Sequence, residues 1–301
     1  MRAASIDIGT NTILLHIAEV EGEKLKPLFE METIVRLGEG LQKNRVILPE
    51  AMKRGLKTLS HYLRRCQAMR AEKIFAVGTS ALREAKNSGD FLSLVKGKLS
   101  LSIEIISGEE EAHLSFLAVA KDLQDQNKSI IVVDVGGGST EFILGKGTLI
   151  EQSVSLPLGS VRFTEQFLHS DPVKENEWEK MEGEIRKLLT DIPHSGEPFS
   201  MVAVGGTATT LASVEQGLKE FEIEKIHYFI LTKEAIGKQL LLYSSRTLDE
   251  RKKIHGLPSN RADVVLAGGA ILYMSMDELN CPSVLVSCHG IRYGLLYQRL
   301  F

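Results

Sequence analysis

The chain has 301 residues, of which 43% are hydrophobic and 25% charged, ordinary values for a globular protein. Its net charge of −3 and the lack of a basic tail argue against nucleic acid as a partner, so an anionic ligand needs a local basic lining. Three scattered cysteines without a CxxC spacing exclude a disulfide framework and a cysteine zinc site. Because no leader pattern and no apolar run near the roughly 18 residues of a membrane span occur, we expect a cytoplasmic protein without a membrane partner.

The first half of the chain predicts strands followed by alternating helices and strands. An apolar strand ends at Asp7, and a polar turn and two further strands follow it as far as residue 32. The hydrophobic periodicity then predicts, in chain order, a helix over 49–69, a strand over 73–79, a helix over 88–98, a strand over 101–107 and a helix over 108–122.

Residues 132–156 repeat the pattern of residues 5–32. Each copy has an apolar strand ending in Asp-(Ile/Val)-Gly, a short turn, a second strand, a glycine turn and a third strand. The two aspartates, Asp7 and Asp134, are 127 residues apart (134 − 7), about one domain length. After the second copy we expect a helix over 174–190, a strand over 200–206, helices over 207–217 and 261–277, a strand over 283–287 and a closing helix over 291–301.

This duplication predicts an α/β protein of two lobes, each a mixed sheet flanked by helices. We expect the lobes at 1–124 and 125–290, because the most polar stretch between two periodic segments lies near 122–128. Ligands in such folds bind at strand ends, so the active site is expected in the cleft between the lobes.

Both glycine turns are candidate phosphate sites, because their backbone N–H groups can approach phosphate oxygens without obstruction. A single such turn more often serves a hairpin, but two matched copies, each preceded by an aspartate, favour a function. The expected substrate-binding residues are Asp7, Gly9, Thr10 and Asn11 in the first copy, and Gly136, Gly137, Gly138, Ser139 and Thr140 in the second.

Asp134 and Glu141 are the candidate metal ligands. Mg²⁺ usually binds one or two carboxylates together with substrate phosphates and water. Alternatively, Asp134 caps its own turn and Glu141 is a solvated strand residue. The position of Glu141 between the turn and the apolar run "FILG" counts against that alternative.

The stretch "ISGEEEAHL" (106–114) contains the candidate general base. Ser107 as N-cap with Glu110 three residues later forms a capping box, which gives Glu110 a structural role. Glu109 lies on the side of the helix opposite its apolar residues and is expected in solvent. Glu111, at the border of the apolar face, lacks such an explanation, so we expect it to accept a proton from water; the alternative is another surface acid.

Two further strand ends complete the predicted site. Arg83 follows the strand over 73–79 and offers a planar fork that suits phosphate oxygens, although a solvated helix face is the alternative. Gly205 and Gly206 end the strand over 200–206 and Thr207 follows it, a place where a phosphate contact and a plain tight turn are both open. The eight histidines show no metal-ligand spacing, and no Ser-His-Asp order is visible.

The motifs "DIGTNT", "VGTSALREAKN", "ISGEEEAHL", "VVDVGGGSTEF", "LPLGSVRFTEQF" and "AVGGTATTL" occur in one order along nearly the whole chain. Their set and order resemble the exopolyphosphatase / guanosine pentaphosphate phosphohydrolase family of the actin-like (ribonuclease H-like) superfamily, in its short two-domain form. The acidic "SGEEEA" helix start with "GTSALREA" is the specific part, because the single motifs recur across the superfamily.

The resemblance implies hydrolysis of a terminal phosphoanhydride bond by water with Mg²⁺, on polyphosphate or on guanosine penta- or tetraphosphates. It implies that Glu111 is the base, Asp134 and Glu141 the metal-linked acids and Arg83 the phosphate-binding arginine, and that residues 291–301 pack on the first lobe. Whether the chain forms a homodimer is left open.

The chain departs from the family near its end. There, Cys288 and Tyr293 replace an aspartate and a glutamate of the family pattern. The alternative functions are a sugar or acetate kinase and a nucleotide-switch protein of the same superfamily.

Overall fold

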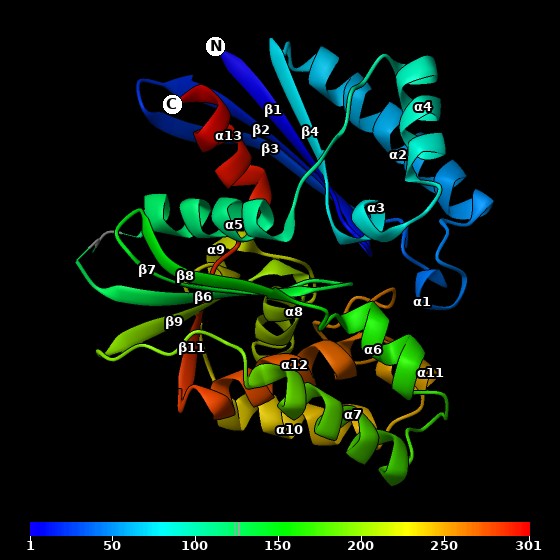
Figure 1. Cartoon of the computed structure of the whole chain (residues 1–301), viewed down its shortest axis with the longest axis vertical. Coiled ribbons are helices and arrows are strands. Elements are labelled where there is room, and N and C mark those ends of the chain that lie inside the picture. The colour runs from blue at the N-terminus through cyan, green and yellow to red at the C-terminus, as the bar shows by residue number, and fades with distance from the viewer. Residues whose placement is uncertain (124, 126) are drawn as a thin grey trace. The chain divides into compact units, whose positions relative to one another are not determined.

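The computed structural model describes residues 1–123, 125 and 127–301. The chain forms two compact units (Figure 1). The first comprises Met1–Ala118 together with Ile291–Phe301, and the second comprises Val119–Gly290. Each unit has its own mixed sheet and its own hydrophobic core, so the predicted fold class, mixed sheets flanked by helices and formed twice, is confirmed.

The sheet of unit 1 has the order β3-β2-β1-β4-β5. Strands β1 and β2 are antiparallel, whereas β1 and β4 run parallel and therefore end at the same edge of the sheet. The strand expected over 101–107 is much shorter, because only two of its residues pair with β4. The strands are β1 (Arg2–Ile8), β2 (Thr12–Glu21), β3 (Lys24–Ile34), β4 (Lys73–Gly78) and β5 (Glu104–Ile105).

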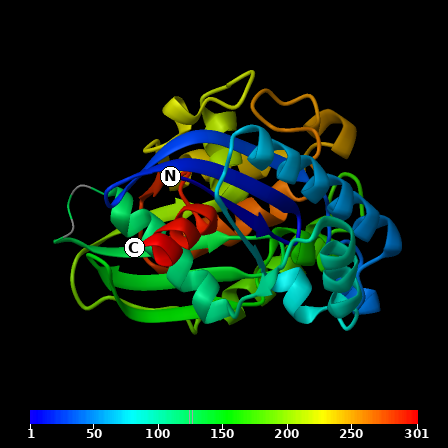
Figure 2. The same cartoon turned by 90° about the horizontal axis from the view of Figure 1, so that it is seen from above.

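Helices cover both faces of this sheet. Ile6 and Ile8 of β1 belong to the core formed with α2 and α4, while Ala3 packs on the opposite face against Leu296 of α13. Figure 2 shows α13 beside the strands of unit 1. The helices are α1 (Leu41–Asn44), α2 (Pro49–Ala68), α3 (Ser80–Glu84), α4 (Ser88–Leu99), α13 (Ile291–Leu300) and α5 (Gly108–Asp122), which continues into unit 2.

The sheet of unit 2 has the order β10-β11-β9-β6-β7-β8. Strands β6, β7 and β8 form an antiparallel meander like β1–β3. The two meanders share one register: Asp7 pairs with Leu14, and Asp134 with Glu141. The predicted repeat is therefore confirmed. The strands are β6 (Ser129–Val135), β7 (Thr140–Lys146), β8 (Leu149–Leu156), β9 (Phe199–Val204), β10 (Ile230–Thr232) and β11 (Ser283–Val286).

Helix α12 forms the centre of the helical layer of unit 2, and α6, α7, α8 and α10 contact it (Figure 1). It is buried along most of its length, which suits its mostly apolar sequence. No helix among the described residues is long and apolar enough to cross a membrane. The helices are α6 (Ser160–Phe167), α7 (Glu175–Leu189), α8 (Gly205–Glu215), α9 (Ile223–Ile226), α10 (Lys233–Ser244), α11 (Leu248–Arg251) and α12 (Val265–Glu278).

Candidate functional site

The first glycine turn, Gly9–Asn11, directly follows β1 and the buried Asp7. Residues 35–38 hold this turn from one side: Gly38 N–H donates to the Thr10 carbonyl at 2.9 Å, and two further N–H groups donate to the Asn11 carbonyl at 2.9 and 2.8 Å. The buried Oδ1 of Asn11 has no hydrogen-bond partner among the described residues. The turn is thus fixed by the fold and keeps a polar side-chain atom for a ligand or water.

The parallel pairing of β1 and β4 brings a second turn beside the first. Thr79 N–H donates to the Ile8 carbonyl at 3.2 Å, and a Cβ on Gly9 would lie 4.0 Å from Thr79 Oγ1. One helical turn further, Arg83 Nη1 donates to the Ile106 carbonyl and to Glu111 Oε2, both at 3.0 Å. Arg83, predicted as a phosphate ligand, therefore forms an ion pair with the predicted base.

Glu111 lies at the start of α5, where the local sequence determines its orientation. Ser107 Oγ accepts the N–H of Glu110 at 3.1 Å, which is the N-cap half of the predicted capping box. Glu109 is exposed, whereas Glu111 is only 6% exposed. The Arg83 guanidinium fixes the Glu111 carboxylate within unit 1.

Asp134 and Glu141 face each other across β6 and β7 in unit 2. Their backbones are paired in register, and their exposures are 8% and 1%. Like charges directly opposite in a sheet are destabilising, so this buried pair favours a cation between or beside the carboxylates. Ser155 Oγ donates to Glu141 Oε1 at 2.7 Å, which orients one carboxylate. Oxygen donors of this kind fit a divalent cation such as Mg²⁺.

The end of β9 completes the surroundings of Asp134. Gly205 has a φ of +84°, and a Cβ there would lie 2.7 Å from Asp134 Oδ1. A Cβ on Gly206 would lie 1.9 Å from an Nη atom of Arg261, so the guanidinium rests directly on this glycine. Sequence reasoning missed Arg261, which lies 127 residues from Asp134 (261 − 134) in a stretch without a recognisable motif. The helix expected over 261–277 begins only at Val265, so Arg261 lies in the turn before it.

The second glycine turn lies beside the same carboxylates. Gly136 N–H donates to the Ser139 carbonyl at 3.0 Å and closes the turn. The hydroxyl of Thr140 donates to the Leu158 carbonyl at 2.6 Å, and that of Thr207 to the Val135 carbonyl at 3.2 Å. Both hydroxyls serve the fold, so a contact of Thr140 or Thr207 with substrate would use the backbone.

Two histidines without a metal-ligand spacing in the sequence lie beside one carboxylate in the structure. Asp122, His227 and His289 offer ligand atoms within 4.8 Å of one another, which makes them a possible metal-binding group. His227 Nε2 and His289 Nδ1 lie 3.1 and 3.2 Å from the Asp122 carboxylate. The Cys288 N–H donates to His227 Nδ1 at 3.1 Å, which leaves the proton of a neutral imidazole on Nε2, toward Asp122. As arranged, the three side chains form a hydrogen-bonded cluster.

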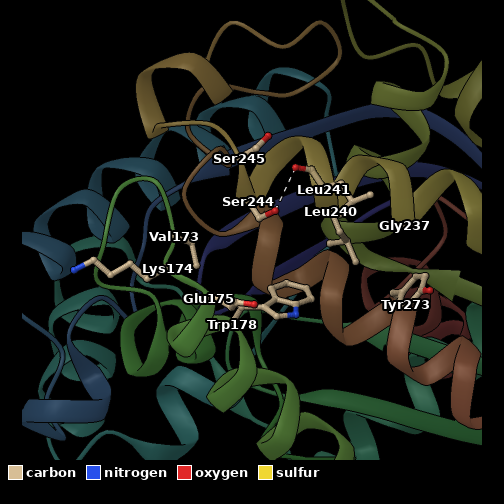
Figure 3. Close-up of a pocket in the computed structure, with 10 residues that line it drawn as sticks. All are labelled: Val173, Lys174, Glu175, Trp178, Gly237, Leu240, Leu241, Ser244, Ser245 and Tyr273. Atoms are coloured by element: carbon tan, nitrogen blue, oxygen red, sulfur yellow. Dashed lines mark hydrogen bonds between the residues drawn. The ribbon is translucent and has the colours of Figure 1, made fainter.

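A separate groove of about 660 Å³ lies among α7, α10 and α12 (Figure 3). Trp178 and Leu240 contribute to its apolar lining, and the Lys174 side chain extends away from the Trp178 ring. Ser244 Oγ donates to the Leu241 carbonyl within α10. None of the predicted site residues lines the groove.

Within unit 1, the structure brings together the first turn, Thr79, Arg83 and Glu111. Within unit 2, it brings together the Asp134–Glu141 pair, the second turn and the start of α8. These features define a class: a duplicated mixed-sheet α/β protein with glycine turns suited to anions beside buried carboxylates. Comparison with known proteins gives the family.

The sequence model of the Ppx/GppA phosphatase family matches residues 16–301. Exopolyphosphatase 2 of Mycobacterium tuberculosis is 33% identical, over 98% of this chain and 97% of that protein. The bifunctional 3-dehydroquinate synthase/phosphatase of Fusobacterium nucleatum is 36% identical over 98% of this chain, which spans 46% of that relative's length. The crystal structure of the Aquifex aeolicus member of the Ppx/GppA family matches with a TM-score of 0.84 and 33% identity, over 100% of this chain and 97% of that one. The chain belongs to the Ppx/GppA phosphatase family.

Proposed function

We propose that this protein hydrolyses the terminal phosphoanhydride bond of inorganic polyphosphate, of guanosine pentaphosphate (pppGpp), or of both. The observation that carries the proposal is the buried Asp134–Glu141 pair, in register on adjacent strands and beside a glycine turn. A paired carboxylate site for a divalent cation next to backbone N–H donors suits a phosphate chain better than a neutral substrate. The exopolyphosphatase relative and the family membership support the same substrate class.

In this proposal Glu111 takes a proton from water as the water oxygen attacks the terminal phosphorus. The P–O bond to the rest of the chain breaks, which releases orthophosphate and a chain one phosphate shorter. Arg83 holds the Glu111 carboxylate in place through the 3.0 Å contact. Mg²⁺, held by Asp134 and Glu141, would neutralise phosphate charge. The N–H groups of the turns at Gly9–Asn11 and 136–139 would bind the phosphate oxygens, and Arg261 would add positive charge.

The three cysteines, Cys66, Cys281 and Cys288, are free and buried, which fits the proposed location in a reducing cytoplasm. The kinase and nucleotide-switch alternatives are not favoured by the family membership.

Released phosphate measured in parallel with polyphosphate, pppGpp and ATP, with and without Mg²⁺, tests the proposed function. We expect Mg²⁺-dependent release from polyphosphate or pppGpp without any acceptor. Turnover of ATP alone with an added acceptor would support a kinase. No release from any of the three substrates would refute the hydrolase.

Glu111→Gln tests the base. The amide cannot accept the proton, so we expect kcat to fall by about 10²–10⁴ while tripolyphosphate binding is largely retained. Glu109→Gln, two residues earlier on the exposed side of α5, is the matched control and should keep wild-type kcat. A kcat of Glu111→Gln near the wild-type value would show that another group is the base.

The sequence predicts that residues of both units act on one substrate, and this remains a prediction. Residues that act as a unit show non-additive effects on the rate. If Glu111 and Asp134 serve one reaction, then Glu111→Gln combined with Asp134→Asn should lower kcat much less than the product of the two single effects. Fully multiplicative effects would argue against a shared site.

A further inference from the structure

The start of α6 donates hydrogen bonds to the three glycine carbonyls of the second turn. The N–H of Ser160 donates to the Gly136 carbonyl at 2.9 Å, and two further N–H groups of α6 donate to the Gly137 carbonyl at 3.0 and 3.1 Å. The Gly138 carbonyl accepts a hydrogen bond of 2.7 Å from the side-chain Nε of Arg162. All three glycine carbonyls therefore have donors from this one element.

This arrangement determines where the N–H groups point. In a trans peptide the carbonyl of one residue and the N–H of the next point in opposite directions. No cis peptide occurs in the turn. The N–H groups of Gly137, Gly138 and Ser139 are consequently turned away from α6, and successive N–H groups on one side form an anion-binding nest.

Glycine at position 159 makes the close approach of α6 possible. A Cβ there would lie 2.3 Å from the Gly137 carbonyl oxygen and 2.5 Å from the Gly138 carbonyl carbon. The carbonyls of Gly136 and Gly137 are then bound by main-chain N–H groups, which no side-chain substitution removes. Only the Gly138–Ser139 peptide depends on a side chain.

We propose that Arg162 is a positioning residue for substrate binding: its guanidinium fixes the Gly138 carbonyl, which directs the N–H of Ser139 toward a substrate phosphate. The proposal rests on the proposed phosphohydrolase function. It assigns Arg162 no contact with the reacting atoms. Because the nest would hold phosphate oxygens alike before and during the reaction, a loss of orientation should change binding more than the chemical step.

Arg162→Gln and Arg162→Lys test this, because the first removes the charge and the second keeps it without the planar fork. We expect Arg162→Gln to raise KM for tripolyphosphate about tenfold, with kcat changed less than about threefold, and Arg162→Lys to lie between it and the wild type. Thr164→Val is the matched control, since Thr164 lies on the same helix and its hydroxyl donates only to the Ser160 carbonyl, at 2.7 Å. Its KM should stay at the wild-type value.

Amide hydrogen exchange over 134–141, with and without tripolyphosphate, gives a readout that does not require turnover. Tripolyphosphate should slow exchange in the wild type and in Thr164→Val, but much less in Arg162→Gln. Unchanged KM and unchanged protection in Arg162→Gln would overturn the proposal, as would the absence of protection in the wild type. If Arg162→Gln has a melting temperature well below that of the control, the test uses Arg162→Lys instead. A raised KM and weaker protection in Arg162→Lys would then support the proposal, and wild-type values of both would overturn it. A wild type that hydrolyses no phosphate chain refutes the proposed function, while the exchange result still decides the role of Arg162.

Discussion

At the scale of single residues, the two copies of the repeat differ at one decisive position. Asp7 and Asp134 occupy matching places in their strands, but the residue paired with Asp7 is Leu14, whereas the residue paired with Asp134 is Glu141. Two acidic residues are therefore direct cross-strand partners in the second copy, but not in the first. The duplicated fold supplies two turns, and the sequence places the candidate cation site beside one of them.

Gly205 should be essential for that site. Gly205→Ala would put a Cβ 2.7 Å from Asp134 Oδ1 at a φ of +84°, so we expect the carboxylate to shift and the Mg²⁺ concentration for half-maximal activity to rise about tenfold or more. Gly217→Ala is a sharp control, because Gly217 has a φ of +59° with no atom within 4 Å of its Cβ position. It should cost similar backbone strain and leave the Mg²⁺ dependence unchanged; an equal effect of both substitutions would contradict the role of Gly205.

At the scale of elements, the start of α5 shows how a helix cap serves a site. Ser107 Oγ binds the N–H of Glu110, and this first turn carries Glu111. The cap thus fixes the orientation of three consecutive glutamates, of which one is buried and joined to Arg83.

Ser107→Ala should lower the free energy of unfolding by about 1 kcal/mol and also lower kcat, because fraying of the first turn disorders Glu111. Thr232→Ala removes an equivalent cap, a hydrogen bond of 3.1 Å from Ala235 N–H at the start of α10, which carries no predicted site residue. Chemical denaturation and steady-state kinetics of the two variants should give similar losses of stability, with a loss of kcat in Ser107→Ala alone. Equal kcat values in both would show that the cap is only structural.

At the scale of the whole molecule, the last helix returns to the first unit and joins a buried polar cluster. Glu30 of β3 lies 3.1 Å from His16 Nδ1 and 3.2 Å from Arg292 Nη2, and it also accepts a hydrogen bond from the Tyr293 hydroxyl. The His16 and Tyr293 rings stack with centroids 4.0 Å apart. Tyr293, which departs from the family pattern, thus connects the two ends of the chain.

This cluster predicts a pH dependence of stability. Burial by itself would raise the pKa of the Glu30 carboxyl, but the hydrogen bonds from His16 and Tyr293 and the charge of Arg292 hold that pKa well below its usual range. A carboxyl with a depressed folded-state pKa stabilises the fold above its unfolded pKa of about 4.3, and this contribution is lost as pH falls below that value.

Glu30→Gln should therefore lower the free energy of unfolding by about 1–3 kcal/mol at pH 7. It should also make the decline of that free energy shallower as pH falls from about 4.3 through the depressed folded-state pKa. Urea denaturation at a series of pH values measures both effects. The exposed Glu23→Gln, in the turn before β3, is the control and should keep the wild-type pH profile. Parallel profiles of Glu30→Gln and the wild type would exclude this role of the cluster.

The sequence by itself determined the repeat, the main strands and helices, the Asp-Gly turns and the inward orientation of Glu111. These features are encoded locally, in apolar periodicity, turn glycines and a helix cap, each of which acts over a few residues. The short strand β5 and the short helices were mispredicted or missed, since elements of two to five residues carry too little periodicity to be recognised. Two longer helices, α6 with 8 residues and α10 with 12, were missed as well.

Only the tertiary structure decided which distant residues meet. It joined Arg83 to Glu111, placed Arg261 on Gly206, brought Arg162 to the Gly138 carbonyl and gathered Asp122 with two histidines. Such contacts depend on strand order, on how closely a glycine lets two segments approach, and on where the chain returns. None of these leaves a fixed spacing in the sequence, so charged side chains that resembled ordinary surface residues became candidate parts of the site once the chain had folded.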